Sequence, residues 1–62
     1  MQDVIAIADS VRESCIEVAI RAYEDAGISG LCAEGRWELA VQAMRDLDTN
    51  SIVSSTLERT GA

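Results

Sequence analysis

The fold is decided by residues 3–26, which read DVIAIADSVRESCIEVAIRAYEDA. Six small or apolar residues recur in this stretch at alternating steps of four and three: Val4, Ala8, Val11, Cys15, Val18 and Ala22. This spacing is typical of a helix that packs along one side. Ser10 and Glu13 are spaced like a capping box, which would start a helix there, but the apolar pattern continues through Ser10. We therefore predict one helix over residues 3–26, in preference to a separate strand over residues 4–8.

Glycine is predicted to end this helix. In Ala26-Gly27-Ile28, Gly27 can take the left-handed conformation of a Schellman motif, and Ile28 can fold back on the last turn. A second amphipathic helix is predicted over residues 34–47. Its start stays open between Gly30, capped by Ser29, and a position close to Gly35, because an interior glycine weakens a helix.

A third helix is predicted over residues 52–59. The apolar side chains of Ile52, Val53 and Leu57 point away from the stripe of the second helix, so a break is expected at residues 48–51. Residues 1–62 are thus expected to form a single all-α domain. Its predicted architecture is an antiparallel helical hairpin followed by a short C-terminal helix.

The apolar surface of the first helix is wider than one partner helix can cover. It extends over roughly 220° of the helical wheel, whereas packing on one side needs a stripe of about 100°. A large uncovered apolar patch is rare on soluble monomers, and chains this short seldom stabilise themselves alone. We therefore expect a homodimer that forms a four-helix bundle, in preference to a monomeric three-helix bundle or to docking onto a different protein. The candidate interface residues are Val4, Ile5, Ala8, Val11, Cys15, Ile16, Val18, Ile20, Ala22 and Tyr23.

Composition argues against several classes of function. The 62 residues include 11 acidic and five basic side chains, all five of them arginine, and no histidine; the net charge is −6. The negative charge argues against direct binding to nucleic acid or to an anionic membrane surface. A short chain without histidine has little means of building a catalytic pocket or a metal site. We expect no enzyme activity, no cofactor, no metal and a cytoplasmic location.

Three features remain as candidate functional groups. Cys15 and Cys32 are expected to be reduced thiols, because they form neither a dense disulfide framework nor a CxxC pair. Arg36 and Trp37 are candidate partner contacts, since both residue types are frequent in binding hot spots. The alternative, which we favour, is that Trp37 closes the end of the core and Arg36 pairs with a nearby acid.

These features favour a small, acidic, non-catalytic protein–protein interaction or regulatory module. One alternative is an acidic accessory subunit or inhibitor of a nucleic-acid-binding protein or enzyme, in which Glu13, Glu17 and Glu24 would meet a basic protein surface. Another alternative is a thiol-based redox module that uses Cys32.

Overall fold

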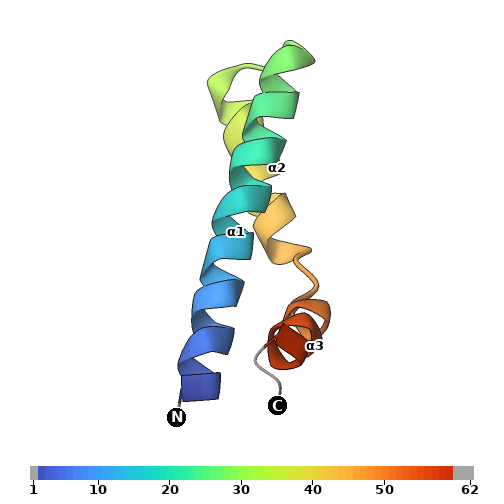
Figure 1. Cartoon of the computed structure of the whole chain (residues 1–62). Helices are drawn as coiled ribbons and strands as arrows, with labels where there is room; N and C mark the ends of the chain where they lie inside the picture. Colours follow the sequence, from blue (N-terminus) through green and yellow to red (C-terminus); the bar gives the residue numbers. More distant parts are fainter. Residues whose placement is uncertain (1, 60–62) are drawn as a thin grey trace.

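The structure, a computed structural model, describes residues 2–59 and contains three helices. They are α1 (Gln2–Ile28), α2 (Ala33–Arg45) and α3 (Thr49–Arg59). α1 packs against both of the others. α2 returns antiparallel along the C-terminal half of α1, and α3 lies across its N-terminal half (Figure 1). The predicted all-α class and the hairpin followed by a third helix are confirmed.

α1 is continuous through Ser10, as the apolar spacing predicts, and residues 4–8 are helical rather than a strand. Ser10 does not start a helix. Its hydroxyl oxygen instead accepts a hydrogen bond from Nη2 of Arg59 at 3.4 Å. Ser10 therefore contributes to the contact between α1 and α3, because it faces the last turn of α3.

α1 ends at Ile28, two residues later than predicted, and Gly30 rather than Gly27 is the left-handed glycine, with φ of 91°. The N–H of Leu31 donates to the carbonyl of Ala26, and the N–H of Gly30 to that of Gly27, each at 3.0 Å. These are the two hydrogen bonds of a Schellman motif. Ile28 is 86% exposed, so the prediction that it folds back is wrong. Half-buried Leu31 occupies that position instead.

The ends of α2 and α3 also differ from the predicted bounds. α2 begins at Ala33, close to the later of the two predicted starts, and ends at Arg45 rather than at residue 47. α3 begins at Thr49, three residues before the predicted position. Oδ1 of Asp48 accepts a hydrogen bond from the N–H of Ser51 at 3.1 Å, which is an N-cap interaction. The cap allows α3 to begin before its first apolar residue.

The interior is formed by small side chains. Ala26 and Ala40 are each 3% exposed, and so is Thr56, whose hydroxyl donates to the carbonyl of Ile52 at 2.8 Å. Among the residues that the structure describes, no large side chain is fully buried. The helices therefore approach each other closely through alanine, and the larger apolar side chains remain at the edges of the contact.

Candidate functional site

Four large apolar side chains gather on one side of the hairpin. We call this surface the Trp37 face; it consists of Ile16, Ile20 and Tyr23 of α1 and Trp37 of α2. All four are exposed, Ile20 at 54% and Trp37 at 61%. A shallow groove of about 370 Å³ runs between the two helices, lined by Ala19, Ile20, Tyr23, Glu24, Trp37 and Ala40.

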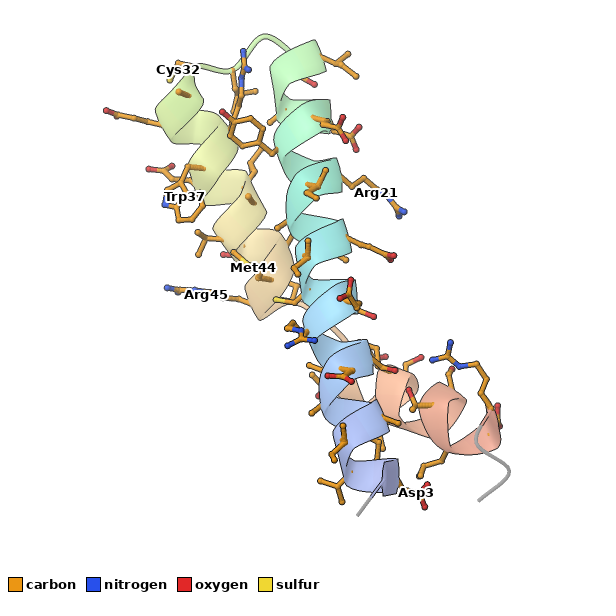
Figure 2. All side chains as sticks on the ribbon, turned by 60° about the vertical axis from the view of Figure 1, so that its left-hand side comes forward. Asp3, Arg21, Cys32, Trp37, Met44 and Arg45 are labelled. Atoms are coloured by element: carbon orange, nitrogen blue, oxygen red, sulfur yellow. The ribbon has the colours of Figure 1, made fainter. Side chains whose placement is uncertain are left out.

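Local sequence explains why this face forms. Ile16, Ile20 and Tyr23 are four and three residues apart, so they share one side of α1. Ala40 occupies the contact between α2 and α1 and is almost completely buried. Trp37, three residues earlier, points out of the helix contact and lies at the rim of the groove (Figure 2). An alanine contact brings the helix axes close together, which leaves no room between them for an indole ring.

The expectation that Trp37 closes the end of the core is therefore wrong. The end of the hairpin is closed by Leu31 and by the side chain of Arg36, both half-buried. Trp37 is left as a large, rigid and solvent-exposed aromatic residue, the type most often found at the centre of binding surfaces. The alternative role, contact with a partner, is consistent with this exposure.

Arg36 does not pair with an acid, contrary to expectation. Its Nε donates a hydrogen bond to the carbonyl of Leu31 at 2.9 Å, and its guanidinium carbon lies 5.8 Å from the centre of the Tyr23 ring. A Cβ atom at Gly27 would lie 3.2 Å from the same guanidinium carbon. Gly27 is thus explained by this close approach, and Arg36 stabilises the turn between α1 and α2.

The ten candidate interface residues are placed on two sides of α1. Six are exposed: Val4, Ile5, Ala8, Ile16, Ile20 and Tyr23. Four are half-buried: Val11, Cys15, Val18 and Ala22. By helical position the half-buried four share the side of buried Ala26, which is the side that packs within the chain. The row spaced by four and three therefore marks mainly the intramolecular contact, and the neighbouring strip marks the exposed surface.

The acidic residues Glu13, Glu17 and Glu24 are exposed, as expected. Glu13 and Glu17 line a polar hollow that also includes Arg59. Sequence reasoning missed Arg59, because nothing in the local pattern indicates that the end of α3 returns to the first half of α1.

Cys32 precedes the first residue of α2 and is exposed, whereas Cys15 is half-buried. The Cys32 side chain makes no N-cap hydrogen bond to the backbone of α2. Even so, the nearby backbone N–H groups of Gly35 and Glu34 favour the thiolate and lower the pKa of Cys32. Desolvation of the thiol and the negative charge of Glu38 raise its pKa, but these effects are weaker.

Cys32 is therefore expected to react with iodoacetamide at lower pH than an ordinary thiol. The measurement is the pH profile of alkylation in a Cys15→Ser variant, with the same variant in denaturant as control. The folded midpoint should lie below the unfolded one, because folding favours the thiolate. By linkage, the thiolate contributes stability above the unfolded pKa, and this is lost as pH falls through the folded pKa. Coincident midpoints would contradict the lowered pKa.

Within residues 2–59, no group of three or more cysteine, aspartate and glutamate side chains is arranged to hold a metal ion. None of the helices in this range has the length and apolar character needed to cross a bilayer.

Fold and surface together define a small all-α protein with an exposed apolar face. No protein-family model matches the chain, and neither the curated proteins nor the solved structures contain a match to it.

Proposed function

We propose that this protein is a non-catalytic protein–protein interaction module that acts as a homo-oligomer, with the Trp37 face as its contact surface. The observation that carries the proposal is the amount of surface left uncovered. A compact monomer of 6.7 kDa exposes about 3,900 Å². This chain exposes 4643 Å². The excess is comparable to the area of about 800 Å² that each partner buries in a standard interface.

The shape of the chain supports the same proposal. Its radius of gyration is 14.1 Å and its extents are 44 × 15 × 14 Å. A compact domain of this length has a radius of gyration of about 10.5 Å, and one of twice the length about 13.7 Å. The chain is thus elongated, as expected of half a bundle rather than of a complete one.

Energetics favour covering the Trp37 face. Burial of apolar surface stabilises an association by about 25 cal/mol per Å² before the costs of ordering are subtracted. Aromatic side chains give much of this at a small entropic cost, because they have only two rotatable bonds. Trp37 and Tyr23 are the aromatic residues of the chain, and both belong to this face.

Trp37 provides the test, because it is the only tryptophan. Its fluorescence should shift to shorter wavelengths as the protein concentration rises, since self-association removes the indole from water. Sedimentation equilibrium on the same samples should show a mass above that of the monomer in the micromolar range. A monomer mass together with unchanged emission over the whole range would refute the proposed function.

A thiol-based role for Cys32 is a second candidate, favoured by its exposure and lowered pKa. The alkylation profile tests its first requirement. A redox role further requires that the Cys32 thiol be oxidised faster than Cys15 by a peroxide.

A further inference from the structure

Along α1, the charged residues at the two ends of the Trp37 face differ in sign. Arg12, Ile16, Ile20 and Glu24 follow one another at four-residue steps, so they lie on the same side of the helix. Arg12 lies at one end of this strip and Glu24 at the other, with the two isoleucines between them. Asp9 also lies near the basic end, where its carboxylate is 3.2 Å from Nη2 of Arg12.

α2 repeats this polarity. Glu34 and Glu38 are exposed in the half of α2 nearer the turn, and Arg45 is exposed in the last turn. The side chains of Trp37 and Arg45 project from α2 in the same direction (Figure 2). Because α2 is antiparallel to α1, its acidic end lies beside Glu24 and its basic end lies toward Arg12. The face therefore has an acidic end near the turn and a basic end away from it.

Two hairpins with aligned helices can meet face to face around a two-fold axis in two ways. An axis parallel to the helices places equal levels together, so the acidic ends of both copies meet and repel. An axis perpendicular to the helices reverses the second copy, and each acidic end then meets a basic end. Charge complementarity selects the reversed arrangement, since like charges brought together at an interface are unfavourable.

We propose that the occupant of the Trp37 face is a second copy of this chain running in the opposite direction. This inference rests on the proposed self-association. In the reversed arrangement Ile16 packs against the partner subunit's Ile20, and Arg12 lies opposite the partner subunit's Glu24. On α2, Glu38 lies opposite the partner subunit's Arg45.

The register is consistent between the two helices. On α1 the pairing is centred midway between Ile16 and Ile20, and on α2 midway between Glu38 and Arg45. Ala19 and Ala40, close to these two centres, line the same groove. One axis can therefore generate the contacts of both helices at once.

The test exchanges the charges of one predicted pair. Glu38→Arg and Arg45→Glu should each weaken homodimerisation roughly tenfold or more at low salt, because each places like charges together twice per dimer. An equimolar mixture of the two variants should restore association, since both cross-pairs are then opposite in charge. Native mass spectrometry should find the heterodimer in excess of a random mixture.

Arg21→Glu is the matched control, because it changes the net charge as Arg45→Glu does but projects from the other side of the molecule (Figure 2). It should leave association nearly unchanged, and circular dichroism should show equal helicity in all variants. A random mixture, or tighter association of either single variant, would overturn the reversed arrangement. Tighter association is what the arrangement with a parallel axis predicts. Failure of the wild type to associate would instead refute the proposed function.

Discussion

An Ile20→Glu variant is expected to associate at least about 100-fold more weakly than the wild type. Ile20 is 54% exposed and lines the groove next to Trp37. Each copy loses about 1.5 kcal/mol of apolar burial, and a symmetric dimer loses it twice, which is about 3 kcal/mol. Removing a carboxylate from water adds to this cost. Sedimentation equilibrium measures the change in the dissociation constant.

Ile28→Glu provides the control for this prediction. Ile28 undergoes the same chemical change at the end of α1, is 86% exposed and does not line the groove. Its variant should associate like the wild type. Equal effects of the two substitutions would show that net charge, and not the Trp37 face, controls association. Circular dichroism must show that both variants keep their helices.

An Ala40→Asp variant is expected to lose most of its helical structure. Ala40 is 3% exposed at the contact between α1 and α2, and the charged residue that lines the same groove is Glu24, another acid. A poorly solvated carboxylate without a cationic partner costs about 2–4 kcal/mol. The core of a chain this small supplies only about 3–5 kcal/mol of stability. The measurement is thermal unfolding followed by circular dichroism.

The same substitution at Ala33 should not lower the stability of the fold. Ala33 is exposed and is the first residue of α2, where the N–H groups and the helix dipole favour a carboxylate. Ala33→Asp should leave the midpoint of unfolding unchanged or raise it slightly. If the two variants unfold at the same temperature, the burial of Ala40 in a close contact between the helices is refuted.

Periodicity predicted the helices well because it reflects a local rule. Side chains three and four residues apart share a helix side whatever the rest of the chain does. The row from Val4 to Ala22 therefore correctly indicated a helix that continues through Ser10. The break before α3 was also predictable, since Ile52 and Leu57 cannot lie on the stripe of α2. Apolar spacing does not give the exact position of the break, because α3 begins at its N-cap Asp48 and not at its first apolar residue.

The exposed site was only partly predictable. The excess of apolar surface on α1 was visible in the sequence, and Ile16, Ile20 and Tyr23 were named with it. Which residues face inward depends on the partner helix, and Ala40 sets how closely α2 approaches. The burial of Ala40 at this contact placed Trp37 outside, whereas its size alone suggested the core.

The sequence by itself determined the all-α class, the number of helices and the surplus of apolar surface, because these follow from local spacing and composition. Only the tertiary structure decided which of the glycines ends α1, where Trp37 lies and what Arg36 contacts. Gly27 and Gly30 have the same local propensity. Gly27 lies beneath the guanidinium of Arg36, nine residues further along the chain, and Gly30 takes the left-handed turn. Such a choice depends on contacts between helices, which local spacing does not encode.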